Sequence, residues 1–373
     1  MYLSDDEFVN IRVSLIRRFI SSNLHYINIA KHYLSVRQFN LLMKNVIGAG
    51  NGTGKFGGKS SGLILGYKII EDHKNDNPIL DNVKVPNSWY LTSDTIMDFI
   101  HYNALEEMIS LKYMDTEEIR AEYPYLQQLF KNSFFPPEIV GKLENLLKEI
   151  GQKPIIVRSS SLLEDSFEAA FSGKYKSLFL SNMGTLSERL SALLDAIAEI
   201  YASTFGPDPI EYRKERGLID FQEQMGILIQ EVVGTQVGDY YFPTFAGVAF
   251  SNNEFRWSSR IKREDGVVRI VAGLGTRAVD RVSNDYSMLA SPGQPGIKVN
   301  IKDEDIIKYS QAEIDVLNLK TNNFETKKIS DILKAYGDRI PGIEKVISIN
   351  KYGNLTAPLG VLWDPQDSDM VVT

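Results

Sequence analysis

Glycines, hydroxyl residues and lysines occur together in residues 48–62, and this combination can bind phosphate. The segment reads GAGNGTGKFGGKSSG and precedes an apolar stretch typical of a helix. Such a loop can cradle an anion, because the N-terminus of a helix presents free N–H groups. For Lys55, Ala49 stands where a P-loop requires its first glycine. For Lys59 that position holds Thr53, so neither lysine completes the pattern. The segment could equally be an irregular linker.

A second candidate for phosphate binding is residues 154–175, PIIVRSSSLLEDSFEAAFSGKY. The short β-branched run bounded by proline predicts a buried strand that ends at Arg158. An arginine at a strand end is held rigidly, and its planar guanidinium can bind phosphate. The serines at 159–161 and the turn at 172–173 would add donors. The alternative is a structural salt bridge from Arg158 to the acids at 164–165.

Two further segments carry weaker signals. Residues 227–250 are two β-runs around a Gly/Asp turn, which alone indicate only a sheet. Residues 273–277 read GLGTR, and one short glycine motif is weak support for a ligand site.

The elements around these segments predict an α+β, or mixed α/β, fold. Helical spacing and a Ser4–Glu7 capping-box pattern indicate helices over 4–45. Residues 85–91 read as a strand, and Ser93 or Asp94 would cap the helix that follows. The remaining expectations are a helical region 103–150 broken at Pro124 and 136–137, a helix at 184–204, strands at 177–180, 227–233, 240–250, 255–259 and 267–271, and short helical pieces in 301–340. Because helices come first and strands later, the order differs from a regular β-α alternation.

The composition of the chain argues against several classes of protein and of site. The 373 residues carry a formal net charge of -7 without a basic stripe, so no nucleic-acid partner is expected. The absence of cysteine excludes disulfides and thiolate chemistry. No apolar run is long enough for a membrane span, and acids precede the basic residues at the N-terminus, the reverse of a secretory signal. We therefore expect a cytoplasmic protein without a membrane contact; homo-oligomer formation is compatible with the sequence.

Taken in order, these segments resemble the N-terminal domain of phosphoenolpyruvate synthases and pyruvate phosphate dikinases. The matching stretches are GGKSSGL at 57–63, VPNSWYLTSDTIMDFI at 85–100, VRSSSLLEDSFEAAFSG at 157–173, LIQEVV at 228–233, AGVAFSNN at 246–253, AGLGTRAVDRV at 272–282 and NDYSML at 284–289. Ala170, Ser172 and Thr276 stand where the family usually has Ser, Ala and Glu.

The resemblance implies an ATP-grasp fold, in which two lobes clamp ATP. Lys59 and Arg158 would be the catalytic cations that bind the phosphates. The other expected nucleotide contacts form a loop over the phosphates and a hinge beside the adenine: Ser172, Gly173, Lys174, Gln230, Glu231 and Val233. The implied domains are an N-terminal helical extension at 1–50, a first lobe at 51–226 and a second lobe at 227–373, truncated at its C-terminal end.

In this family ATP phosphorylates a histidine on a separate swivelling domain, and the phosphoryl group then passes to pyruvate. The strand pair that holds Mg²⁺, with its Glu and its Gln before Arg-Pro, is not found in this sequence. The histidine motif and the phosphoenolpyruvate-binding barrel are also not found, and all four histidines precede the nucleotide segments. No metal ligand is therefore assigned within this chain, although the family uses Mg²⁺ with ATP.

These departures predict a fragment of a longer enzyme, inactive by itself, whose other domains would meet pyruvate or phosphoenolpyruvate. Two alternatives stay open. The acceptor could be an antibiotic or a glucan, as in related phosphotransferases. The chain could also be a module that binds nucleotide or a partner without catalysis.

Overall fold

A computed structural model describes residues 4–48, 54–162, 175–221, 223, 225–279, 285–358 and 369–373. The chain forms two compact units, Met1–Val232 and Val233–Thr373. Helices and several separate sheets confirm the predicted α+β class. Among the described helices, none is both long and apolar enough to cross a membrane.

The first unit is organised around one five-stranded sheet of order β1-β2-β5-β3-β4. Its strands are β1 (Val46–Ile47), β2 (Ser88–Leu91), β3 (Ile155–Ser161), β4 (Ser177–Leu180) and β5 (Met225–Glu231). β1 pairs with β2 in parallel, and the other neighbours are antiparallel. β3 and β5 pair along their whole length, from Ile155 opposite Glu231 to Ser161 opposite Met225. The strand predicted at 227–233 is therefore the middle strand of this sheet.

One face of this sheet supports the larger core. The helices around it are α5 (Thr95–Tyr102), α6 (Thr116–Lys131), α7 (Pro137–Ile150), α8 (Leu186–Ser203) and α9 (Pro207–Glu215). Val157 of β3 and Ile227 and Ile229 of β5 point into this core and are fully buried. Phe99 of α5 lies at its centre, with its ring 4.6 Å from that of Phe135. Burial of one such side chain contributes about 1.5–3 kcal/mol to folding.

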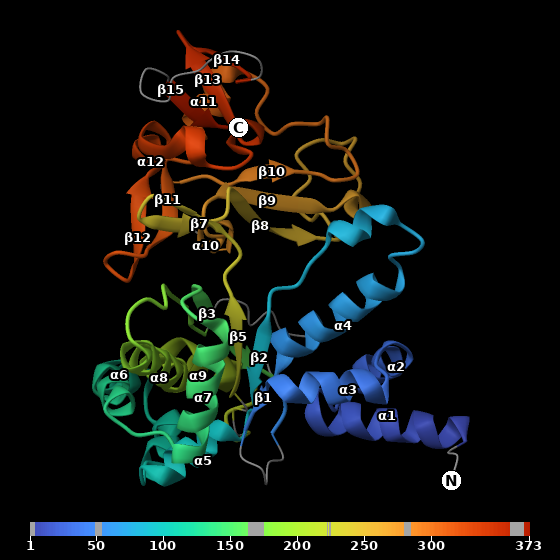
Figure 1. Cartoon of the computed structure of the whole chain (residues 1–373), viewed down its shortest axis with the longest axis vertical. Coiled ribbons are helices and arrows are strands. Elements are labelled where there is room, and N and C mark those ends of the chain that lie inside the picture. The colour runs from blue at the N-terminus through green and yellow to red at the C-terminus, as the bar shows by residue number, and fades with distance from the viewer. Residues whose placement is uncertain are drawn as a thin grey trace. The chain divides into compact units, whose positions relative to one another are not determined.

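The opposite face is covered by the N-terminal helices α1 (Asp5–Phe19), α2 (Leu24–Tyr33), α3 (Val36–Leu42) and α4 (Gly58–Asp72). Figure 1 shows α1 to α4 gathered on one side of the strands of the first unit and α5 to α9 on the other. The predicted capping box is present, because the Ser4 side chain accepts from Glu7 N and the Glu7 carboxylate accepts from Ser4 N. Ile16, Ile27 and Leu228 share one core on this face, so the helical extension packs directly on the sheet.

The described residues of the second unit form three small antiparallel sheets and short helices. Strands β8 (Phe245–Phe250), β9 (Val267–Ala272) and β10 (Met288–Ala290) form one sheet, and the other sheets have the orders β12-β11-β7-β6 and β14-β13-β15. The remaining elements are β6 (Thr235–Val237), β7 (Tyr240–Phe242), α10 (Thr276–Val279), α11 (Asp303–Lys308), β11 (Glu313–Asn318), β12 (Asn323–Lys328), α12 (Ile329–Tyr336), β13 (Ile347–Lys351), β14 (Asn354–Thr356) and β15 (Asp369–Val372).

Two expectations about proline and strand ends were wrong. α6 passes through Pro124 without ending there. The carbonyl of Arg120, which loses its partner, lies on an exposed side where water can replace the missing N–H. The capping box of Asp115 stabilises the start of this helix, and Phe130 is buried near its end. β3 does not end at Arg158 but continues to Ser161, because its whole length pairs with β5.

The strand expected at 255–259 is absent from the described second unit. Asn253 Oδ1 accepts from the N–H of Phe255, and Ser258 Oγ accepts from the N–H of Arg260. Such local side-chain bonds compete with strand pairing. The hairpin of β11 and β12 was not predicted, since only short helical pieces were expected at 301–340. The last three strands, β13 to β15, were not predicted either.

Candidate functional site

The candidate phosphate site lies where the N-terminus of α4 meets the end of β3. Gly57 is the N-cap of α4, with a φ of 81°, which favours glycine. A Cβ at Gly57 would lie 1.5 Å from the carbonyl oxygen of Ser160, and a Cβ at Gly226 would lie 2.7 Å from that of Phe56. Only glycine permits these approaches. The two glycines therefore let the segment before α4 pack directly on β3 and β5.

β3 provides the cap that Gly57 lacks. The first N–H groups of a helix have no partner within that helix. Here Ser160 Oγ accepts from Ser60 N at 3.1 Å, and the two serine hydroxyls are also 3.1 Å apart. This tertiary contact fixes the position of the first turn of α4, the part of a helix that best attracts an anion.

Lys59 and Arg158 carry the positive charge of the site. Lys59 Nζ donates to Ser159 Oγ at 3.0 Å, which places the ammonium beside the residue that follows Arg158. The Arg158 guanidinium donates to Gln230 Oε1 at 3.5 Å. Both cations are half-buried. The structure thus brings Lys59, Arg158 and Gln230 to the same part of the first unit.

Gln230 is itself held in place by a chain of hydrogen bonds. Its Nε2 donates to Ser88 Oγ at 2.9 Å, and that hydroxyl donates to the carbonyl of Pro86 at 2.8 Å. With its amide nitrogen committed to β2, Gln230 turns its oxygen toward Arg158. This chain of hydrogen bonds, from Pro86 through Ser88 to Gln230, orients the guanidinium of Arg158.

The other expected hinge residues have different surroundings. Glu231 alternates with Gln230 and points to the opposite face of the sheet, where its carboxylate lies 3.1 Å from Lys153 Nζ. The N–H groups of Glu231 and the next residue donate to the carbonyls of Asn87 and Pro154. Val233 is exposed and begins the second compact unit. The nucleotide contacts expected of Gln230, Glu231 and Val233 stay predictions.

Three expected contacts cannot be placed. Ser172, Gly173 and Lys174 lie outside the described residues, as do the acids at 164–165 that were the alternative partners of Arg158. Their roles stay predictions.

The serine run after Arg158 has a different role from the expected one. All three hydroxyls are fully buried and bonded within the protein. Ser159 accepts from Lys59, Ser160 contacts Ser60, and Ser161 donates to the carboxylate of Glu223. These contacts join β3 to α4 and to Glu223.

Two residues of the site were missed as such by the sequence analysis. Ser93 and Asp94 were expected only as a helix cap. Asp94 occupies the N-cap of α5 without a capping hydrogen bond from its side chain. Its Oδ2 instead accepts from Gly54 N at 3.1 Å, and Ser93 Oγ accepts from Lys55 N at 3.0 Å. They tie the described end of the glycine-rich segment to the β2–α5 turn.

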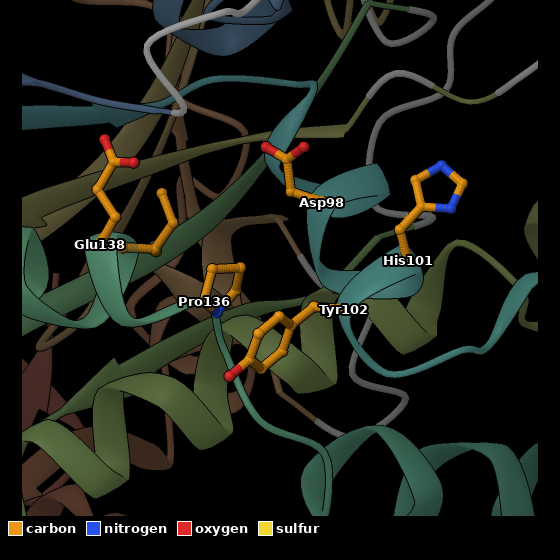
Figure 2. Close-up of a pocket in the computed structure, with 6 residues that line it drawn as sticks. Asp98, His101, Tyr102, Pro136 and Glu138 are labelled. Carbon is orange, nitrogen blue, oxygen red and sulfur yellow. The ribbon is translucent and has the colours of Figure 1, made fainter.

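A hollow of about 420 Å³ lies between α5 and the start of α7. Figure 2 shows Asp98, His101 and Tyr102 of α5 on one side of it and Pro136 and Glu138 on the other. Burial, and then the charge of Asp94, raises the pKa of Asp98. An acidic lining repels phosphate, so this hollow is a poorer nucleotide site than the pair of cations at β3.

The GLGTR segment of the second unit is pinned to β11. Thr276 Oγ1 donates to Asp315 Oδ2 at 2.5 Å. Arg277 is almost buried and reaches Asp285 at 2.7 Å, Glu313 at 2.7 Å and Asp315 at 3.1 Å. This network explains the segment structurally, with Thr276 serving as a donor to a carboxylate. Within the described ranges, no group of three or more His, Asp and Glu is arranged to hold a metal ion.

Comparison with known proteins gives a consistent picture. The family model described as pyruvate phosphate dikinase, AMP/ATP-binding domain, matches residues 53–354. A phosphoenolpyruvate synthase from Aquifex aeolicus is 25% identical over 193 residues, which are 49% of this chain and 21% of that protein. A rifampicin phosphotransferase from Bacillus subtilis is 24% identical over 232 residues, 58% of this chain and 24% of that protein. The chain thus spans less than a quarter of the length of these relatives.

Proposed function

The chain belongs to the family of pyruvate phosphate dikinase AMP/ATP-binding domains, a family of ATP-binding phosphotransferases, and on that basis we propose that it is the ATP-binding part of a dikinase-like enzyme. Lys59 and Arg158 would bind the phosphates of ATP. The observation that supports this most directly is the contact of Lys59 with Ser159, because it joins the first turn of α4 to the residue that follows Arg158 in β3.

The arrangement suits phosphoryl transfer. That reaction depends on positioning and on neutralising the charge of the phosphates rather than on covalent chemistry by the protein. Lys59 and Arg158 supply two held cations, and the first turn of α4 supplies N–H groups. Mg²⁺ would add charge neutralisation when bound with ATP.

The adenine base of ATP would lie toward the C-terminal end of β5. Since the N–H groups of Glu231 and Val232 already bond within the first unit, adenine would rely on the carbonyl groups of this segment and on Val233. The loop of Ser172, Gly173 and Lys174 would close over the phosphates.

In the complete enzyme, we propose, a phosphoryl group leaves ATP as its P–O bond breaks and a P–N bond forms on a histidine of a separate swivelling domain. The group then passes to pyruvate and gives phosphoenolpyruvate. The similarity to a phosphoenolpyruvate synthase supports this acceptor. The similarity to a rifampicin phosphotransferase favours, as a second candidate, an antibiotic acceptor bound by other domains.

Calorimetric titration with ATP and Mg²⁺ tests the proposal, beside Arg158→Ala and the control Lys44→Met. Loss of a charged hydrogen bond costs roughly 1.5–3 kcal/mol, so Arg158→Ala should weaken ATP binding by about ten- to a hundredfold. Lys44 is exposed, and its substitution should leave the affinity unchanged. No binding by the folded wild-type chain, or equal binding by Arg158→Ala, would contradict the proposed site.

A further inference from the structure

A cavity of about 450 Å³ lies within the second unit and shares no residue with the candidate nucleotide site. Its walls come from β10, from residues 297–300, from residues 306–311 at the end of α11, and from the last two residues of the chain as given. The walls are mainly apolar. Ligand sites commonly combine apolar walls with a few polar groups and span about 300–1,000 Å³, so the cavity is large enough to hold a ligand.

One wall of the cavity is the edge of a sheet. β10 has β9 as its neighbour on one side and is the outermost strand of the described sheet, as Figure 1 shows. Five consecutive residues, 286–290, line the cavity. Because successive side chains of a strand point to opposite faces, a cavity over one face would be lined by alternate residues. The cavity therefore runs along the outer edge of β10.

This outer edge carries unpaired backbone groups. Residues 288–290 pair with β9, and within the described ranges their backbone makes no hydrogen bond to any other segment. Successive residues of an antiparallel strand direct their N–H and C=O groups to opposite sides, so part of these groups point away from β9. Residues 298–300, which also line the cavity, make no backbone hydrogen bond to the described chain either. An unpaired strand edge is a template for one more strand.

Three aromatic side chains line or border the same cavity. Phe255, Tyr286 and Tyr309 are 67%, 45% and 38% exposed. The rings of Tyr286 and Tyr309 meet edge to face, with their centroids 5.1 Å apart. Grouped apolar side chains that remain exposed often mark a binding surface, and a further ring in contact with them would gain from both burial and ring geometry.

Lys298 gives the cavity its charge. It is exposed, and it is the one charged residue among the described residues that line the cavity. No Asp or Glu is among those lining residues. Complementary charge favours the correct partner and disfavours wrong ones, so an acidic side chain suits this cavity better than a basic one.

We propose that the cavity binds an extended peptide segment of a partner protein, which adds a strand to the outer edge of β10. The segment places an aromatic side chain against Phe255, Tyr286 and Tyr309 and an acidic side chain beside Lys298. In this mode of recognition, hydrogen bonds between the main chains provide affinity, and pockets for the side chains provide specificity. The volume of the cavity suits a short segment rather than a folded element.

The tetrapeptide Val-Phe-Val-Glu, acetylated and amidated at its ends, is the probe, titrated into the whole chain and followed by calorimetry. A second peptide has the same side chains but carries methyl groups on its two central amide nitrogens. Successive amides face opposite sides, so this peptide loses a donor toward β10 in either register. It should bind at least about tenfold more weakly. Equal binding of the two peptides, or no binding of the first, would overturn the proposal.

Changes in the side chains locate the peptide. Val-Ala-Val-Glu lacks the ring and should bind about ten- to a hundredfold more weakly than the probe. Lys298→Glu should weaken binding of the probe by about two- to fivefold and strengthen binding of Val-Phe-Val-Lys to a similar extent. Lys320→Glu makes the same change at an exposed position of this unit that does not line the cavity, and it should alter neither affinity. Equal effects of the two substitutions would contradict binding at this cavity.

Hydrogen exchange of the amides at 287–290 identifies the occupant. At least one of these amides should exchange rapidly in the free chain and slowly in the presence of the probe. Slow exchange of all four in a free monomer would mean that the chain covers its own edge. Exchange that slows as the protein concentration rises, together with a dimer in sedimentation equilibrium, would mean that a second copy covers it. Either result would refute a partner peptide.

Discussion

The ammonium of Lys59 lies 3.0 Å from the hydroxyl of Ser159, although 100 residues separate them in the sequence. This contact joins the glycine-rich segment to the arginine-bearing strand. A second connection involves Ser160 of the same strand. The backbone of Gly57 packs closely on the Ser160 carbonyl, and Ser160 Oγ accepts from the N–H of Ser60 in the first turn of α4. The candidate phosphate site is therefore a product of packing between α4 and β3.

Lys59→Met should weaken ATP binding by about ten- to a hundredfold, because the phosphates lose one charged hydrogen-bond donor. Binding of adenosine, which has no phosphate, should change little. Titration of both ligands into wild type, Lys59→Met and the exposed-site control Lys44→Met measures this. Equal losses for ATP and adenosine would mean that the lysine supports the fold rather than the phosphates.

Gly57→Ala should destabilise the first unit by about 1–3 kcal/mol or more, because alanine is strained at positive φ and its Cβ would overlap the Ser160 carbonyl. Gly62→Ala is the matched control within α4. A Cβ at Gly62 has no neighbour within 4 Å, so that change should stabilise the helix by about 0.5–1 kcal/mol. Urea unfolding of the two variants provides the test. Equal stability of both would show that the loop does not pack on β3 as described.

Arg277→Met should destabilise the second unit by about 3–5 kcal/mol, because it leaves the buried carboxylates of Asp285 and Asp315 without their cation. Arg263→Met removes an exposed pair with Glu254 and should cost less than about 1 kcal/mol. Hydrogen exchange of the amides of β11 reports on this unit separately. Similar protection in both variants would refute a structural role for the Arg277 network.

Glu223→Gln should alter how stability depends on pH. Burial raises the pKa of Glu223 above its ordinary value of 4.5, so above that value the native protein binds more protons than the unfolded chain. The free energy of unfolding that Glu223 contributes is therefore present at low pH and is lost as pH rises through the raised native pKa. Glu223→Gln has no carboxyl group at this position, so its free energy of unfolding does not fall for this reason.

Urea unfolding of wild type and Glu223→Gln from about pH 5 to about pH 8 measures the effect. The variant should gain stability relative to wild type as pH rises. A difference that stays constant, or that shrinks with rising pH, would contradict the raised pKa of Glu223.

The sequence alone indicated the family segments and much of the first unit. Short-range rules were sufficient where a signal is local. The Ser4–Glu7 capping box depends on residues three apart, and the strand at Ile155 was marked by β-branched residues after a proline. The fold class followed from the order of such elements. The cations Lys59 and Arg158 could be named because each stands in a recognisable segment.

Tertiary structure decided the contacts that use those residues. β3 continues to Ser161 because it pairs with β5 along its whole length. The serines at 159–161, which the sequence had suggested as donors to phosphate, are therefore buried. Asp94 accepts a hydrogen bond from Gly54 N in the glycine-rich segment, a contact that its position before a helix did not predict. Burial and partnership depend on chain segments far apart, and a pattern of neighbouring residues carries no measure of either.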